Sequence, residues 1–156
     1  RQTTARTRRF HELQLHKALM NIPEPVMKFL NYRDRSTEEV RRYLRRKNIV
    51  SEAEIPAVIK KLEELGFAND TRFTENRIRY RIGNLYGPFY IQRELAGLGI
   101  SAETFRPLLA ELEPEFVDAA RQYAAKIKGG LDGPRLEKRL LGRGFSTNQV
   151  KLALKA

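Results

Sequence analysis

Apolar side chains recur every three or four positions along most of the chain, which is the spacing of one helix face. This pattern runs nearly without interruption from Val26 onward. No stretch alternates apolar and polar residues with the enrichment in β-branched side chains that is typical of a strand. The pattern therefore predicts an all-α fold.

Three segments of the chain can be laid over one another, because each carries two apolar residues four positions apart on one predicted helix face. The aligned pairs are Val40 and Leu44, Ile91 and Leu95, and Leu136 and Leu140. We expect three tandem three-helix repeats, over residues 25–66, 67–113 and 114–156, forming a curved, elongated array. Residues 1–24 are expected to form a basic arm, partly disordered or with a short helix.

Residues that commonly begin or end helices also recur at equivalent positions of the aligned repeats. Asn48, Gly99 and Gly144 align where a helix commonly ends in the left-handed conformation. Three serines precede a Glu or Gln at the spacing of a capping box. These pairs are Ser36 and Glu39, Ser51 and Glu54, and Ser146 and Gln149. Pro56 and Pro107 conflict with helices that begin at the aligned serines, so those helices either begin later or are kinked.

The amino-acid composition excludes several classes of protein. The chain of 156 residues has no cysteine, which excludes disulfides, thiolate metal sites and cysteine nucleophiles. No apolar run approaches the ~18 residues that a membrane-spanning helix needs. Since no stretch has the pattern of a secretory signal peptide, we expect a cytosolic protein.

The charge is strongly positive and unevenly distributed. Lys and Arg number 30 against 19 Asp and Glu, a formal net charge of +11 at pH 7. Residues 1–66 carry 15 basic and 9 acidic side chains, residues 67–113 carry 6 of each, and residues 114–156 carry 9 and 4. A single-sign field at both ends of the sequence favours a polyanionic partner such as nucleic acid.

Candidate catalytic and metal sites find little support. His11 and His16 are five positions apart and do not share a helix face as a zinc pair would. The glycine-rich residues 128–133 lack the Gly-Lys-Ser/Thr ending of a phosphate-binding loop. No nucleophile, base and orienting group come together, so we expect a protein that is not an enzyme and that uses no metal or cofactor.

The basic clusters are the better candidates for function, since arginine makes bidentate contacts to phosphate. The first cluster comprises Arg41, Arg42, Arg45, Arg46 and Lys47. The second comprises Arg77, Arg79 and Arg81, with Tyr80 and Tyr86 nearby for base stacking. The third comprises Arg135, Lys138, Arg139 and Arg143. One basic position recurs in the repeat register as Arg42, Arg93 and Lys138.

Three stretches of the chain are similar to the motifs of a known protein family. Residues 31–40, NYRDRSTEEV, resemble its R-x-R-S-x-x-E-L segment. Residues 65–73, LGFANDTRF, are similar to G-Y-L-D-D-x-R-F. Residues 86–101, YGPFYIQRELAGLGIS, resemble G-x-x-x-I-x-x-E-L-x-x-x-G-I. Together they resemble the RecX family of regulators over about residues 26–154, and residues 1–25 have no counterpart in it.

This resemblance implies a modular all-helical protein that binds the RecA recombinase and its nucleoprotein filament and restrains ATPase and strand-exchange activity. It also implies direct binding to single- and double-stranded DNA, without sequence preference. The three basic clusters and Arg93 would then contact DNA or the filament. We expect a monomer with no membrane partner.

Two other functions are compatible with the residues. In the first, each repeat is a helix-turn-helix-like module, the protein is a DNA reader or transcription regulator, and the helix containing Arg41–Lys47 enters a major groove. In the second, the protein is a helical scaffold that binds only another protein. Sequence-specific DNA binding would favour the first, and no DNA binding even at low salt would favour the second.

Overall fold

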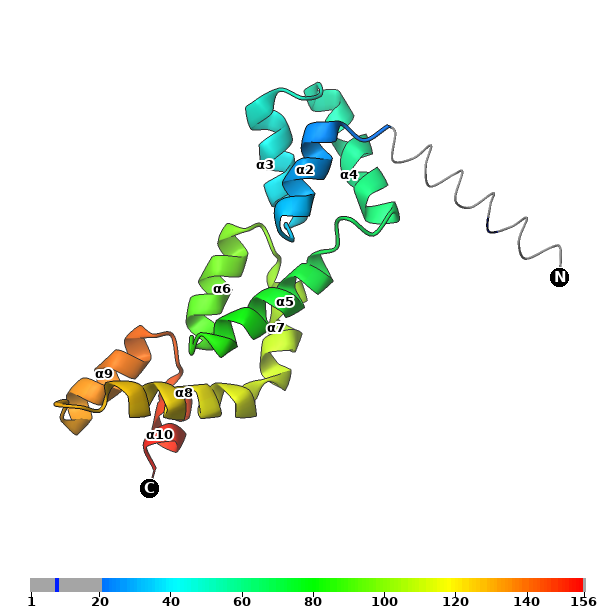
Figure 1. The fold of residues 1–156 in the computed structure, drawn as a ribbon. Coiled ribbons are helices and arrows are strands. Elements are labelled where there is room, and N and C mark those ends of the chain that lie inside the picture. The colour runs from blue at the N-terminus through cyan, green and yellow to red at the C-terminus, as the bar shows by residue number, and fades with distance from the viewer. Residues whose placement is uncertain (1–7, 9–20, 156) are drawn as a thin grey trace. The chain divides into compact units, whose positions relative to one another are not determined.

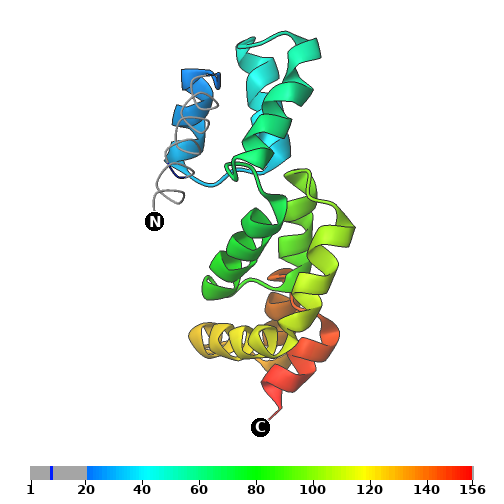
Figure 2. The ribbon, with the colours of Figure 1, turned by 90° about the vertical axis from the view of Figure 1, so that its right-hand side faces the viewer.

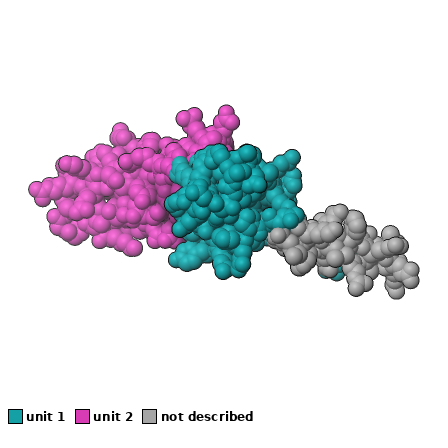
Figure 3. Space-filling view, turned by 90° about the horizontal axis from the view of Figure 1, so that it is seen from above, with its two compact units in different colours: residues 1–69 teal, residues 70–156 magenta. Residues whose placement is uncertain are grey.

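The computed structural model describes Arg8 and residues 21–155. Every regular element within these residues is a helix, and none is a strand (Figure 1). The predicted all-α fold is therefore confirmed for this part of the chain. The chain divides into two compact units, unit 1 over residues 1–69 and unit 2 over residues 70–156 (Figure 3).

Two predictions fall largely outside the described residues. The basic arm was predicted over residues 1–24, of which the structure describes Arg8 and residues 21–24. His11 and His16 also lie outside the described part. Pro23 and Pro25 flank the first residue of a helix, where a proline is tolerated because its missing N–H would have no helical partner.

Unit 1 is built around the aligned apolar pair of the first predicted repeat. Its helices are α2 (Glu24–Tyr32), α3 (Thr37–Lys47), the short 3₁₀ helix η1 (Glu52–Glu54) and α4 (Ile55–Glu64). Val40 and Leu44 of α3 are fully buried against Val26 of α2 and Ile59 and Leu62 of α4. Helices α3 and α4 lie side by side (Figure 2). Apolar burial of this kind is the main source of stability for so small a unit.

The ends of α3 follow from its sequence. The Ser36 hydroxyl accepts a hydrogen bond from the Glu39 backbone N–H at 3.2 Å, and the Glu39 carboxylate accepts one from the Ser36 N–H at 2.9 Å. At the other end, Asn48 adopts the left-handed conformation, with φ of 49°. The predicted capping box and helix stop are both confirmed, and together they set where α3 begins and ends.

Unit 2 contains six described helices. They are α5 (Asp70–Gly83), α6 (Pro88–Gly97), α7 (Ala102–Glu111), α8 (Glu113–Ile127), α9 (Gly133–Gly142) and α10 (Thr147–Leu154). One hydrophobic core takes side chains from all of them, including Ile91, Leu95 and Leu140, which are fully buried. Helix α8 packs on α9 and α10, and α5 packs on α7 and α8 (Figures 1 and 2). The second and third predicted repeats thus share a core.

Two glycines bring the start of α6 against the turn between α9 and α10. The Gly87 N–H donates to the Arg143 carbonyl at 3.1 Å, and the Phe89 N–H donates to the Gly144 carbonyl at 2.9 Å. A Cβ at Gly87 would lie 2.1 Å from the Gly144 carbonyl carbon. No residue but glycine fits there, because real Cβ atoms do not approach other atoms so closely.

The remaining predictions on helix ends have different outcomes. Gly99 and Gly144 have φ of 78° and 99°, as the predicted left-handed stops require. Pro56 is the second residue of α4, which begins after η1 and therefore later than the serine at position 51. Pro107 lies inside α7, which begins directly after Ser101.

Candidate functional site

The first basic cluster lies on α3, and acidic side chains of unit 1 neutralise much of it. Glu38 forms ion pairs with both Arg41 and Arg42, the latter at 3.4 Å. Arg45 forms an ion pair with Glu52 at 2.8 Å. Three of the four predicted arginines therefore have a carboxylate partner within their own unit.

The last two residues of this cluster differ from the others. The Arg46 guanidinium lies 5.7 Å from the centre of the Tyr43 ring, and Lys47 is exposed. Tyr43 stacks on Phe29 with ring centres 4.1 Å apart, and Arg35 lies over Phe29 at 4.0 Å. Phe29, Arg35 and Tyr43 could not be connected from the sequence, because this stack joins α2, α3 and the turn between them.

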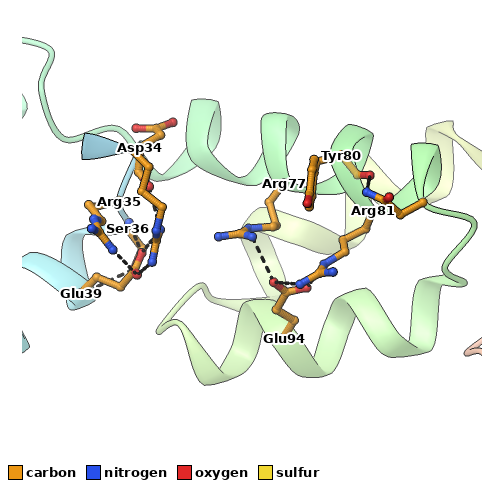
Figure 4. Close-up of polar contacts among 10 residues, drawn as sticks. Asp34, Arg35, Ser36, Glu39, Arg77, Tyr80, Arg81 and Glu94 are labelled. Atoms are coloured by element: carbon orange, nitrogen blue, oxygen red, sulfur yellow. Dashed lines mark hydrogen bonds and ion pairs between the residues drawn. The ribbon is translucent and has the colours of Figure 1, made fainter. Parts of the chain in front are cut away.

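At the start of α3, the Glu39 carboxylate pairs with two further arginines (Figure 4). It forms ion pairs with Arg33 and with Arg35, the latter at 3.8 Å. Burial alone would raise the pKa of Glu39, but hydrogen bonds from Arg33 and the Ser36 N–H, with the guanidinium charges, lower it overall. Burial and the neighbouring Arg33 charge lower the pKa of Arg35. This group of charges therefore holds the first turn of α3 in place.

The second cluster is also internally paired. Glu94 of α6 forms ion pairs with Arg77 at 3.3 Å and Arg81 at 2.7 Å, both from α5 (Figure 4). The hydrogen bond to Glu94 raises the pKa of Arg81, although burial opposes this. The Arg81 guanidinium also lies within 5.5 Å of the ring centres of Tyr80, Tyr86 and Tyr90. These contacts tie α5 to α6.

Arg79 and Arg93 stand apart from that pairing. Both side chains are exposed, and neither has a described carboxylate within ion-pair distance. Tyr80, next to Arg79, is 59% exposed. Arg79 and Arg93 therefore remain available for an anionic partner, whereas Arg77 and Arg81 are engaged by Glu94.

The structure brings the third cluster together around one groove of about 660 Å³ in unit 2. All four predicted residues line it, with three residues that carry no charge. The lining residues are Tyr123, Leu131, Arg135, Lys138, Arg139, Gly142 and Arg143. The spacing along α9 accounts for three of the cations, because positions 135, 138 and 139 lie on one helix face.

Arg143 connects this groove to neighbouring parts of unit 2. Its guanidinium donates hydrogen bonds to the carbonyls of Leu85 at 2.9 Å and Asn84 at 2.7 Å. It also lies 3.5 Å from the ring centre of Tyr86 and 4.7 Å from that of Tyr123. These contacts fix the orientation of Arg143, so that it serves the fold as well as the groove.

The other groove cations are largely unneutralised. Arg135 has a long contact of 3.8 Å to Asp132, and both side chains are exposed. Lys138 and Arg139 have no carboxylate within ion-pair distance in the part of the chain that the structure describes. Concentrated positive charge in a concave surface attracts anions more strongly than the same charge on a flat one.

Sequence reasoning missed Tyr123 and Leu131 as groove residues. Tyr123 lies in a stretch with ordinary helical periodicity, and Leu131 lies in the glycine-rich turn 128–133, which lacks a phosphate-binding motif. Tyr123 lies in α8 and meets Arg143 only through the packing of α8 against α9. A local pattern could not have paired them.

Other kinds of site find no support in residues 21–155. Within them, no three His, Cys, Asp or Glu side chains gather as metal ligands would. None of the helices described combines the length and apolar character that crossing a bilayer requires.

Comparison with known proteins identifies the family. The family model described as "RecX, first three-helix domain" matches residues 26–62. The regulatory protein RecX of Xanthomonas axonopodis pv. citri is 32% identical over 127 residues, which cover 78% of each chain. That of Stenotrophomonas maltophilia is 31% identical and covers 78% of this chain and 77% of the relative.

Solved structures show the same fold. The crystal structure of RecX from Lactobacillus salivarius aligns with a TM-score of 0.76 at 22% identity, covering 90% of this chain and 94% of that one. The chain thus has the all-helical architecture of a class of bacterial regulatory proteins. It belongs to the RecX family.

The residues that carry the family resemblance mostly hold the fold. Arg33, Ser36 and Glu39 of the first stretch form the charged cap of α3. Gly66 of the second stretch has φ of 78° at the end of α4, and Gly87 of the third packs on Gly144 without room for a side chain. Because these roles are structural, family membership does not itself locate a ligand site.

Proposed function

We propose that this protein binds the RecA recombinase and its nucleoprotein filament and restrains ATPase and strand-exchange activity, with DNA binding that does not depend on sequence. Membership of the RecX family of regulatory proteins supports this role. In this proposal the protein is a non-catalytic regulator that acts as a monomer in the cytoplasm without a cofactor.

The observation that carries the proposal is positive charge that is not neutralised within the fold. Lys138 and Arg139 line a groove without a carboxylate partner, and Arg79 and Arg93 are exposed and unpaired among the described residues. A filament of protein on DNA presents phosphates, which such cations bind. Contacts spread over several RecA subunits would oppose filament growth and the rearrangements that accompany ATP turnover.

The alternative of a sequence-specific DNA reader uses α3 as a recognition helix. The ion pairs of Arg41 and Arg42 with Glu38 weigh against this use, because both guanidinium groups would have to leave a carboxylate before contacting bases. Binding that is indifferent to sequence should weaken steeply with salt, with log K falling by about 0.7–0.9 per phosphate neutralised. A marked preference among duplex sequences would favour the alternative.

The direct test is co-sedimentation with RecA assembled on single-stranded DNA, with bare DNA as the control. We expect more of the protein to sediment with the filament than with DNA alone. Stoichiometric protein should also lower RecA ATPase and strand exchange. Unchanged rates under those conditions would reject the proposed function.

A further inference from the structure

We propose that the groove between α8 and α9 binds a segment of single-stranded DNA, with phosphates against the cations of α9 and a base against the aromatic wall. This inference rests on the proposed function and deepens it, since it assigns DNA contact to one place in unit 2. The groove is defined by its lining residues Tyr123, Leu131, Arg135, Lys138, Arg139, Gly142 and Arg143.

The α9 side of the groove carries the positive charge that a phosphate group needs. Arg135, Lys138 and Arg139 are exposed and share one face of the helix. Lys138 and Arg139 have no ion-pair partner among the described residues, and Arg135 has only the 3.8 Å contact to Asp132. Glu137, the acidic neighbour on α9, does not line the groove. A phosphate entering here therefore displaces no strong internal ion pair.

The opposite side is suited to a base. Tyr123 of α8 and Leu131 present aromatic and apolar surface to the groove. The Arg143 guanidinium lies over the Tyr123 ring and is held there by its bonds to the Leu85 and Asn84 carbonyls. Because the guanidinium also stacks on Tyr86 at 3.5 Å, the surface left for an unpaired base is that of the Tyr123 ring. Because the fold already orients Arg143, little side-chain entropy is lost when a base binds.

The size of the groove favours a single strand. Its volume of about 660 Å³ lies within the range of pockets that bind small ligands, roughly 300–1,000 Å³, and so accommodates a nucleotide. A duplex keeps its bases paired and stacked inside and cannot place one in such a groove, whereas a single strand can. The combination of cations, an aromatic wall and this volume points to single-stranded DNA.

The test measures binding of fluorescein-labelled oligo(dT) of about 15 nucleotides, a length within the usual site sizes, by fluorescence anisotropy. The double variant Lys138→Gln/Arg139→Gln should bind roughly tenfold more weakly at low salt. The slope of log K against log salt should fall in magnitude by about 1.4, since each phosphate contact on a single strand contributes about 0.7. An unchanged slope would overturn the inference.

A matched control removes the same charge elsewhere in unit 2. Arg106 of α7 and Lys151 of α10 are exposed and do not line the groove. The variant Arg106→Gln/Lys151→Gln should leave the slope within the error of the wild type. If it lowers the slope as much as the groove variant does, the effect belongs to net charge and the groove is not the site.

Gly142 gives a second test that leaves the cations intact. It lines the groove, a Cβ there meets nothing within 4 Å, and its backbone has no positive φ. Gly142→Glu places a carboxylate in the groove and should weaken oligo(dT) binding at least as much as Gly142→Gln. Circular dichroism confirms that each variant is folded. Binding unchanged by both substitutions would overturn the inference.

The outcomes separate this inference from the proposed function. If the groove variants bind oligo(dT) as the wild type does while the protein still restrains RecA ATPase, the groove inference fails and the proposed function stands. If the groove variants lose oligo(dT) but the wild type never affects RecA, the proposed function fails and the groove inference stands. Loss of duplex binding alone, with oligo(dT) unaffected, would also overturn the groove inference.

Discussion

The α3 cluster of unit 1 and the α8–α9 groove of unit 2 resemble one another in sequence but not in structure. On α3, Arg41, Arg42 and Arg45 all have carboxylate partners. In the groove, Lys138 and Arg139 have none among the described residues. The density of basic residues along a chain is therefore a poor guide to where free positive charge lies on the fold.

The two clusters differ in ion pairing because acidic residues occupy different sequence positions relative to the basic ones. Glu38 precedes Arg41 and Arg42 by three and four positions, which is the spacing at which side chains meet on a helix. Lys138 has no carboxylate three or four positions before it, and Glu137 is adjacent and does not face the groove. Local pairing thus makes one cluster part of the scaffold and leaves the other available to a ligand.

Arg143 differs from the other groove cations because it makes hydrogen bonds within the fold. Its loss should therefore cause the largest decrease in stability of all the variants considered. Arg143→Ala removes two charge-assisted hydrogen bonds and leaves the Asn84 and Leu85 carbonyls without them. We expect the free energy of unfolding to fall by roughly 3 kcal/mol. Calorimetry should then show a melting temperature lower by about 10–20 °C.

The controls for this prediction test geometry rather than charge. Arg143→Lys keeps the charge but lacks the planar fork that reaches both carbonyls, so it should recover little of the lost stability. Lys138→Gln, at an exposed position, should leave the melting temperature nearly unchanged. A stable Arg143→Ala variant would show that these contacts do not support unit 2.

The next prediction compares the two clusters directly. Replacing Arg41, Arg42, Arg45 and Arg46 together with Ala removes four charges from α3, twice the number removed by Lys138→Gln/Arg139→Gln. We nevertheless expect only about a threefold loss of oligo(dT) affinity for the α3 variant, against roughly tenfold for the groove variant. Anisotropy titrations at one salt concentration make the comparison. A larger loss from the α3 variant would reverse the proposed division between the clusters.

The third prediction concerns the charged cap of α3. Glu39→Gln keeps an acceptor for the Ser36 N–H, as Gln149 does for Ser146 in α10, but loses the charge that pairs with Arg33 and Arg35. We expect a loss of about 1 kcal/mol in the free energy of unfolding at neutral pH. Denaturant titration measures it.

This loss should depend on pH in a defined direction. The pKa of Glu39 in the folded protein is lowered from an ordinary value of 4.5, so the folded state holds its proton less tightly than the unfolded state. The stabilisation is therefore complete above that ordinary value and disappears as the pH falls through the lowered pKa. Wild type and Glu39→Gln should converge in stability under acid. A difference that persists there would show that the carboxylate charge is not its cause.

Local features of the fold could be predicted from the sequence because they depend on neighbouring residues. The apolar pair Val40 and Leu44, the Ser36 capping box and the left-handed Asn48 each need only a few positions to specify them. The core shared by the two C-terminal repeats and the contact of Gly87 with Gly144 could not, because they depend on how distant segments pack.

In the candidate site, too, features set by neighbouring residues could be predicted, and features set by packing between helices could not. Arg135, Lys138 and Arg139 were predicted as part of one basic cluster, and in the structure they line one groove. The engagement of Arg77 and Arg81 was not predicted, because Glu94 comes from the next helix. Pairing between helices decides which cations are free, and hydrophobic periodicity carries no information about it.

The smallest effect should come from releasing charge on α3. Glu38→Gln removes the carboxylate shared by Arg41 and Arg42, which makes the Arg41 guanidinium available to phosphate and removes a negative charge beside Arg42. We expect oligo(dT) affinity to rise about two- to threefold and the salt slope to steepen by up to about 0.7. Since partly exposed ion pairs contribute little, stability should fall by only about 0.5 kcal/mol. Glu63→Gln, which removes an exposed charge from α4, is the matched control. An equal rise in both variants would mean that net charge alone sets the affinity, and that internal pairing does not distinguish α3 from the groove.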